Sequence, residues 1–240
     1  MARKAEIKPL QWDTEYFGIR CGKAVVYDSD TDFSEFCQDT CEYEFVTIQN
    51  IGNNVEVNKQ IAINTSAYLV DVNIQFEKEI LTDNINGSNS CIIMKTVDTP
   101  DNIRRKLTVE KNDFKFSKFV CDDELKKRNG YLVYREWLKN ACKDANKYFA
   151  LLMSKDNVCA YILFNVDNNI GTIELVKVAK EYQGQHIATS MIESIEKFLA
   201  DKNITKLRVG TQVNNIPAIN LYHSIGFKEI SRTSVFHLWK

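Results

Sequence analysis

The second half of the chain shows a regular alternation of apolar and polar segments. Strict or near-strict alternation predicts strands, and apolar side chains recurring every three or four residues predict amphipathic helices. The elements predicted in this way are, in order, strands at 148–153, 158–166 and 172–179, a helix at 188–201, a strand at 206–212, a helix capped by Asn215, and one or more strands at 227–240. This order is typical of an α/β domain with a mixed sheet.

The first half has fewer clear periodic segments. Alternation predicts strands at 45–49 and 68–76, and apolar spacing predicts a helix at 122–146, which Gly130 is expected to break or kink. Residues 81–115 are rich in Asn, Asp, Thr and Ser. We therefore expect a boundary there, with an N-terminal part at 1–95 and a C-terminal domain at 96–240. No internal repeat is evident.

Composition narrows the class of protein. Of 240 residues, 44% are hydrophobic, which suffices for a core and excludes disorder as the main state. The 31 basic and 32 acidic residues nearly cancel, so a nucleic-acid partner is not expected. The chain has no long apolar run and no secretory leader, so we expect no membrane partner and a cytoplasmic location. The seven cysteines lack metal-ligand spacing, and we expect reduced thiols and no metal.

The loop between the predicted strand at 172–179 and the helix at 188–201 is the strongest candidate for chemistry. A loop at a helix start offers free backbone N–H groups at the positive end of the helix dipole, which suits phosphate. Gly184 permits close backbone approach, and Gln183 and Gln185 add neutral donors. The loop has neither a P-loop lysine nor a dinucleotide fingerprint. Taken alone, it is also compatible with a plain strand-to-helix connection.

Two motifs resemble those of the GNAT superfamily of N-acetyltransferases. Val176-Lys-Val followed by Gln183-Gly-Gln-His-Ile-Ala188 resembles its acetyl-CoA-binding motif, with His186 where the family usually has a glycine. The segment at 207–227 resembles its next strand and helix. The residues in register with that helix pattern are Asn215, Ala218, Leu221, Tyr222, Gly226 and Phe227.

This resemblance implies the fold and the cosubstrate. It implies an α/β GNAT fold with a mixed central sheet flanked by helices, beside a smaller N-terminal α/β part, and an acetyl-CoA-dependent acyltransferase that transfers directly to an amine. The residues implied in cofactor binding are Val176, Lys177, Val178, Gln183, Gly184, Gln185, His186, Ile187, Ala188 and Asn215. Asn215 is equally explained as a helix N-cap.

The resemblance also implies two catalytic roles. Tyr222 would protonate the departing thiolate as general acid, and its alternative is a helix tyrosine packed in the core. Glu174 would act as base, and its alternative is a cross-strand or solvent-facing charge.

Further segments resemble the dTDP-fucosamine acetyltransferases and their relatives, which acetylate dTDP-linked 4-amino-4,6-dideoxy sugars. These segments are 10–18, 116–119 and 134–137, and Lys118 replaces an arginine of that group. The resemblance implies a nucleotide-sugar substrate. The substrate residues implied are Ser117, Lys118, Phe119, Tyr134 and Trp137, whose aromatic members can also be core. The segment at 10–18 can also be a structural corner.

Two other functions remain open. One is a GNAT enzyme acting on a polypeptide or another small amine, for which the acidic residues 122–124 suggest a groove. The other is a domain that binds CoA without turnover, which the histidine at position 186 favours. A homodimer is an open expectation.

Overall fold

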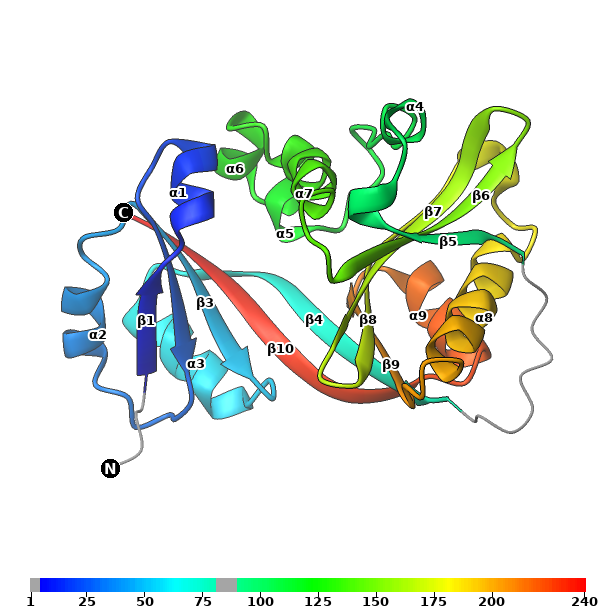
Figure 1. Ribbon diagram of the computed structural model, residues 1–240. Helices are drawn as coiled ribbons and strands as arrows, with labels where there is room; N and C mark the ends of the chain where they lie inside the picture. Colours follow the sequence, from blue (N-terminus) through cyan, green and yellow to red (C-terminus); the bar gives the residue numbers. More distant parts are fainter. Residues whose placement is uncertain (1–4, 81–89) are drawn as a thin grey trace.

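The computed structural model describes residues 5–80 and 90–240, which form one mixed sheet covered by helices on both faces (Figure 1). The strands are β1 (Ala5–Pro9), β2 (Cys21–Val26), β3 (Phe45–Ile51), β4 (Tyr68–Glu79), β5 (Ile92–Lys95), β6 (Lys147–Ser154), β7 (Asn157–Asp167), β8 (Ile170–Val178), β9 (Lys206–Gln212) and β10 (Lys228–Trp239). The helices are α1 (Gln11–Phe17), α2 (Phe33–Asp39), α3 (Val55–Asn64), α4 (Asp101–Arg104), α5 (Lys118–Cys121), α6 (Asp123–Lys127), α7 (Val133–Ala141), α8 (Ile187–Ala200) and α9 (Ile216–Ser224). Short 3₁₀ turns occupy Thr96–Asp98, Gly130–Leu132 and Lys180–Tyr182.

The sheet contains an internal repeat that the sequence does not reveal. Its strand order is β1-β2-β3-β10-β4-β9-β8-β7-β6-β5. The first eight strands in this order contain two equivalent sets, β1–β4 and β7–β10. If each strand of one set is exchanged with its counterpart in the other and the order of the eight is reversed, the same order results, with the same parallel and antiparallel pairs. Each half inserts its last strand into the other half, because β10 lies between β3 and β4, and β4 lies between β10 and β9. The expectation of no internal repeat is therefore wrong at the level of topology.

Local sequence features accompany this repeat. Asn54 caps α3 and Asn215 caps α9, and each side chain accepts hydrogen bonds from the first turn of its helix. Seven residues after these caps stand Ile61, which is fully buried, and Tyr222. The two halves therefore have the same arrangement of elements. They differ at this position, which is Ile61 in the first half and Tyr222 in the second.

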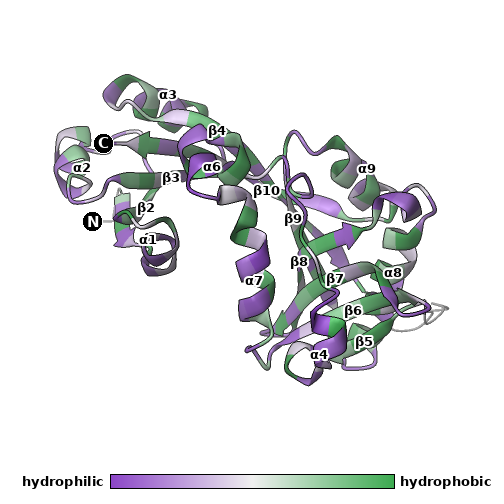
Figure 2. Ribbon diagram, turned by 90° about the horizontal axis from the view of Figure 1, so that it is seen from above, coloured by the Kyte–Doolittle hydropathy of each residue, from purple (hydrophilic) through white to green (hydrophobic). Residues whose placement is uncertain are grey.

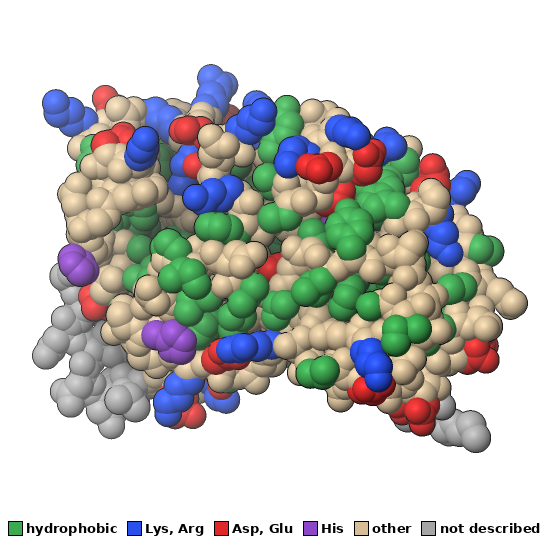
Figure 3. Space-filling view, turned by 180° about the vertical axis from the view of Figure 1, so that it is seen from behind, with side chains coloured by type: hydrophobic (Ala, Val, Ile, Leu, Met, Phe, Trp, Pro, Cys, Tyr) green, Lys and Arg blue, Asp and Glu red, His purple; other side chains and the backbone are tan. Residues whose placement is uncertain are grey.

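The two faces of the sheet carry different helices. Helices α2, α3, α8 and α9 pack on one face and α1 and α4–α7 on the other, with α7 above the middle of the sheet (Figures 1 and 2). The strands are predominantly hydrophobic, whereas each helix has both polar and apolar residues (Figure 2). Seen from behind, hydrophobic side chains gather across the middle of the surface, and both signs of charge alternate along its edges (Figure 3).

The predicted elements of the second half are confirmed, whereas the helix predicted at 122–146 is wrong in extent. It is divided into α6, a 3₁₀ turn and α7. Asn129 adopts a left-handed backbone, with φ of 64°. A Cβ at Gly130 would lie 2.1 Å from the carbonyl oxygen of Phe119, so the chain turns where only glycine fits.

The boundary expected in 81–115 falls partly outside the description, since residues 81–89 are not described. The described remainder forms β5, a 3₁₀ turn and α4. The division at 95 and 96 stays a prediction. Among the described residues, no helix has the length and apolar character needed to cross a membrane.

Asp122 connects the two halves through a buried hydrogen-bond cluster. Its Oδ2 accepts hydrogen bonds from His237 Nδ1 at 2.6 Å, the Tyr68 hydroxyl at 2.7 Å and Trp239 Nε1 at 3.0 Å. Its Oδ1 accepts from the first N–H groups of α6. Burial alone would raise the pKa of Asp122, but the hydrogen bonds from His237 and Tyr68 outweigh it and hold the pKa below its usual range.

Replacing this carboxylate tests the cluster. We expect Asp122→Asn to lower the free energy of unfolding by about 2–4 kcal/mol, because buried donors lose a charged acceptor. The control Asp123→Asn removes an exposed carboxylate paired with Lys126, and about 0.5 kcal/mol or less is expected. Urea unfolding at pH 7 measures both. Equal losses would contradict a structural role for Asp122. Because its folded pKa lies below the unfolded value of about 3.9, its contribution is present at neutral pH and is lost on acidification through the folded pKa.

Candidate active site

A β-bulge in β8 opens the sheet. Leu163 and Phe164 of β7 pair with Leu175 and Ile173 of β8, so Glu174 between them has no partner residue. Strands β8 and β9 pair in parallel only as far as Ile173, which faces Val209. Beyond the bulge the two strands part, although β8 continues to pair with β7 and β9 with β4. Their facing backbone edges are therefore left without a strand partner.

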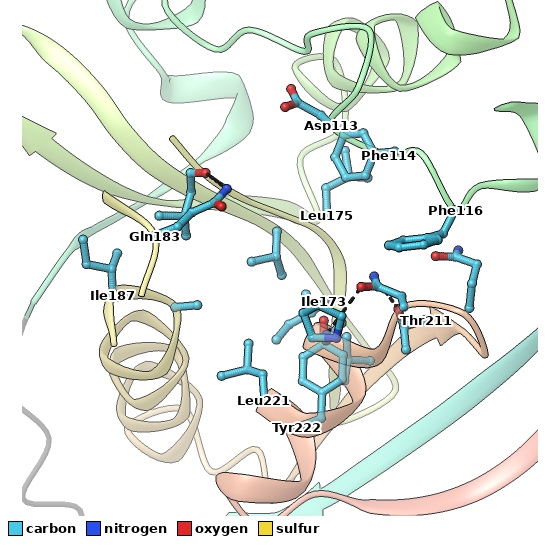
Figure 4. A pocket seen from close by; sticks show the side chains of 18 of the residues that line it. Asp113, Phe114, Phe116, Ile173, Leu175, Gln183, Ile187, Thr211, Leu221 and Tyr222 are labelled. Atoms are coloured by element: carbon cyan, nitrogen blue, oxygen red, sulfur yellow. Dashed lines mark hydrogen bonds between the residues drawn. The ribbon is translucent and has the colours of Figure 1, made fainter. Parts of the chain in front are cut away.

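A cavity of about 620 Å³ lies at this gap (Figure 4). It has the size of a small-molecule site. Ile173 and Leu175 of β8, Thr211 of β9, and Leu221 and Tyr222 of α9 surround it in the close view. The residues that the sequence predicts as functional and that line the cavity are Tyr134, Glu174, Val176, Val178, Gln183, Gly184, His186, Ile187, Ala188, Asn215 and Tyr222. Lys177, Gln185, Ser117, Lys118, Phe119 and Trp137 do not line it.

The start of α8 provides free backbone donors at one end of the cavity. The N–H groups of residues 184–189 have no acceptor among the described parts of the chain, and the first bond of the helix runs from the N–H of Ser190 to the carbonyl of His186. Gly184 and His186 both have a left-handed backbone, with φ of 75° and 57°. His186 thus adopts the conformation for which glycine is usually needed, and its side chain is exposed.

Side chains of this region tie the loop and its neighbours in place. Gln183 donates to the carbonyl of Val178 and Gln185 to that of Glu181, each at 3.0 Å, so both amides serve the loop itself. The ammonium of Lys177 lies 2.7 Å from Asp113, and Lys177 itself does not line the cavity. Of Lys177, only the backbone remains available to a ligand at the gap.

Tyr222 lies on α9 at the closed end of the gap. Its ring packs 5.6 Å from Phe76 and 5.8 Å from Phe227, measured between centroids, and its hydroxyl has no hydrogen-bond partner among the residues described. Burial raises the pKa of Tyr222, so the phenol stays protonated at neutral pH. Asn215 caps α9 by accepting from the N–H of Ala218 at 3.4 Å. Tyr222 therefore both packs in the core and lines the cavity.

Comparisons with known proteins agree with this geometry. Residues 112–227 match the model of the acetyltransferase (GNAT) family. This region, just under half of the chain, is therefore similar to GNAT acetyltransferases. A GCN5-related N-acetyltransferase from Sphaerobacter thermophilus has the same fold, with a TM-score of 0.62 at 11% identity over 98% of this chain and 76% of the other. The predicted GNAT fold, a mixed sheet flanked by helices, is confirmed.

Curated relatives match shorter stretches. Streptothricin acetyltransferase from Escherichia coli is 37% identical over 60 residues, which is 25% of this chain and 34% of that protein. The spore coat polysaccharide biosynthesis protein SpsD from Bacillus subtilis is 20% identical over 129 residues, which is 54% of this chain and 45% of that protein. The chain thus spans less than half the length of these relatives.

Within the region that matches the family model, Glu174 is held by three donors. Its Oε2 accepts from Trp137 Nε1 at 2.9 Å and from Lys147 Nζ at 2.7 Å, and its Oε1 accepts from Asn165 Nδ2 at 2.8 Å. The side chain is only 9% exposed. A carboxylate can accept about four hydrogen bonds, so one position on Oε1 remains.

A second cavity, of about 470 Å³, lies on the other side of this ion pair. Trp137 and Lys147, both partners of Glu174, line it, so the Glu174 cluster stands between the two cavities. Lys118 and Phe119 also line the second cavity. Three of the predicted substrate residues therefore come together there.

The other two predicted substrate residues lie elsewhere. Tyr134 lines the first cavity, and its hydroxyl donates to Ser117 Oγ at 3.0 Å. Ser117 is buried and caps α5, so it supports the site by holding α5 and the Tyr134 hydroxyl in place. Sequence reasoning missed Lys23, Thr47 and Gln49 of the second cavity, because nothing in their local pattern distinguishes them from other strand residues. No cluster of three or more metal-binding side chains occurs among the described residues.

The backbone at position 186 can be tested by paired substitutions. We expect His186→Gly to be more stable than His186→Ala by about 1 kcal/mol, because only glycine adopts a left-handed backbone without strain. The matched pair Glu193→Gly and Glu193→Ala, in the exposed middle of α8, should show the opposite order by a similar amount. Thermal or urea unfolding measures all four. The same order at both positions would contradict the left-handed assignment at His186.

Proposed function

We propose that the chain is an acetyl-CoA-dependent N-acetyltransferase that transfers the acetyl group directly to an amine. The observation that carries this proposal is the parting of β8 and β9 beside the start of α8, with Tyr222 at the gap. Acetyl transfer needs a thioester and an amine held close together, and two cavities that meet at the Glu174 cluster support that arrangement.

The residues of the first cavity fit acetyl-CoA. The unpaired backbone edge of Val176–Val178 offers amides to the pantetheine arm as a strand would, and the free N–H groups of 184–189 offer an anion site for the pyrophosphate. Asn215 lines the same cavity. The fit supports the roles assigned to these residues, with Lys177 and Gln185 contributing only backbone groups.

Tyr222 is the proposed general acid. When the amine nitrogen bonds to the acetyl carbon, the carbon–sulfur bond breaks and the thiolate needs a proton. The Tyr222 phenol keeps that proton because burial raises its pKa, and no protein acceptor among the described residues competes for it. Strand N–H groups at the gap stabilise the charge that develops on the carbonyl oxygen.

Glu174 is proposed to receive the amine proton through water. One acceptor position is left on Oε1 for that water. The same carboxylate also holds Trp137 and Lys147 in place in the wall between the cavities. Both roles are compatible with its place at the bulge.

For the acceptor, we propose an amino sugar carried on a nucleotide, of the dTDP-4-amino-4,6-dideoxyhexose type. The resemblance of segments 10–18 and 116–119 supports it, since residues of both line the second cavity. The name of SpsD, a polysaccharide biosynthesis protein, points in the same direction.

A polypeptide or another small amine is the second candidate. The name of streptothricin acetyltransferase favours a small molecule. Asp122 does not contribute to the acidic groove suggested for a basic peptide, because its side chain is fully buried in its hydrogen-bond cluster. Binding without turnover loses its support, because His186 adopts the backbone that a glycine would provide.

Tyr222→Phe tests the chemistry. We expect kcat to fall by about 10²–10⁴-fold, because the phenolic proton is lost, while the Kd for acetyl-CoA changes little, because the ring remains. His223→Ala, an exposed neighbour on the same helix, is the control. Mass spectrometry of the acetylated product gives kcat, and calorimetry gives Kd. Unchanged turnover would remove Tyr222 from the mechanism.

A panel of amines tests the acceptor. We expect acetylation of a dTDP-4-amino-4,6-dideoxyhexose and no acetylation of peptide N-termini or lysines, because residues of segments 10–18 and 116–119 line the second cavity. Mass spectrometry of the mixture detects a gain of one acetyl group. Acetylation of peptides alone would overturn the nucleotide-sugar assignment.

A further inference from the structure

The second cavity is built by the N-terminal half of the repeat and by the helices that precede the second half. Helix α1 and strands β2 and β3 supply one wall, and α5 and α7 supply the other. The N-terminal half has no gap of its own, because β2 and β3 pair without interruption from Cys21 and Phe45 to Val25 and Gln49. This half therefore contributes side chains to a ligand site rather than backbone to a cofactor site.

Two lysines line the cavity without an acceptor. Among the described residues, neither Lys23 on β2 nor Lys118 on α5 has a hydrogen bond or an ion pair within 4 Å, although Lys118 lies 5.0 Å from the Phe119 ring centroid. Both side chains are partly buried, and burial lowers the pKa of each. The positive charge of Lys23 lowers the pKa of Lys118 further, so the two ammonium groups are close enough to repel each other. An anion placed there would satisfy both.

An aromatic surface adjoins these lysines. Trp12 of α1 lines the cavity and is 37% exposed. Tyr16 stacks on it, with ring centroids 5.0 Å apart and planes 11° apart. One face of the indole is thus supported, and a planar base can stack on such a surface.

We propose that the second cavity binds a nucleoside diphosphate, with the diphosphate against Lys23 and Lys118 and the base on Trp12. This rests on the proposed function, whose nucleotide-linked acceptor it places, and it assigns the N-terminal half the nucleotide. The sugar then points toward Trp137, whose indole bonds to Glu174 at the edge of the acetyl-CoA cavity.

The acidic residues of the cavity set the charge balance. Asp13 lines it, and burial raises the pKa of this carboxyl, while its charge acts on Lys118. Asp144 accepts a hydrogen bond from the N–H of Asn146, and Lys147 is paired with Glu174. Asp13 is a carboxylate of the cavity whose charge acts directly on Lys118, as does that of Asp71 outside the lining. Removing the charge of Asp13 should therefore strengthen the binding of a diphosphate.

Calorimetric titration with dTDP, and separately with inorganic pyrophosphate, tests the site. The protein is first saturated with CoA, so that the anion site at α8 is filled, and a parallel titration omits CoA. We expect Lys23→Met and Lys118→Met each to weaken both ligands by about tenfold or more. Trp12→Ala should weaken dTDP by about tenfold and leave pyrophosphate unchanged. Lys228→Met, at an exposed site outside both cavities, is the control.

The Asp13→Asn variant distinguishes an effect of charge on ligand binding from an effect of a damaged fold. We expect it to bind pyrophosphate about two- to fivefold more tightly, the effect of one partly exposed charge, whereas a destabilised cavity would bind more weakly. Absence of dTDP binding, or binding that neither lysine substitution weakens, overturns the proposal. Because these titrations need no acetyl transfer, an inactive protein that still binds dTDP through Lys23 and Lys118 would refute the proposed function and leave the site standing.

Discussion

The site depends on one constraint, the extra residue that the bulge at Glu174 inserts into β8. Parallel strands joined along their length leave no room for a ligand, because every facing backbone group is paired. Here the pairing of β8 with β9 ends at Ile173, while each strand keeps its other neighbour. The sheet therefore stays intact on both sides of an opening, and the free backbone edges, the start of α8 and Tyr222 all converge there.

The same residue separates the two cavities. Being unpaired in the ladder, Glu174 turns its carboxylate to Trp137, Lys147 and Asn165, and the first two of these also line the second cavity. A single bulge thus creates the gap between β8 and β9 and builds the partition beside it. The N-terminal half, which repeats the topology without a bulge, stays closed and supplies Lys23 and Trp12 instead. The two halves are joined by exchanged strands and by the Asp122 cluster, which keeps both walls of the second cavity in one body.

The order of elements in the second half was predictable because its periodic segments are long and its helices have clear ends, such as Asn215 before α9. The bulge was not predictable, since Ile173-Glu-Leu175 alternates like any half-buried strand. Short elements such as α1 and α2, of seven residues each, are too brief for periodicity to detect. The repeat left only slight traces, including the paired asparagines before α3 and α9 and the glycines Gly22 and Gly171 on equivalent strands.

The candidate site was predictable in part. Motif resemblance located the loop at 183–188 and Tyr222, because backbone geometry there is encoded in adjacent residues. It placed Lys118 and Trp137 with Ser117 and Tyr134, whereas the structure distributes these side chains over two cavities and a buried cap. Which face of the sheet a side chain reaches depends on register, and register between distant strands is not visible in a single sequence.

The central claim is that acetyl-CoA occupies the gap between β8 and β9. Amide hydrogen exchange with and without CoA tests it most directly. We expect protection of residues 175–178 and 184–189 on addition of CoA, with no change in the matching strand of the N-terminal half, Cys21–Val26. Absence of protection at 175–178, or equal protection in both halves, would contradict it.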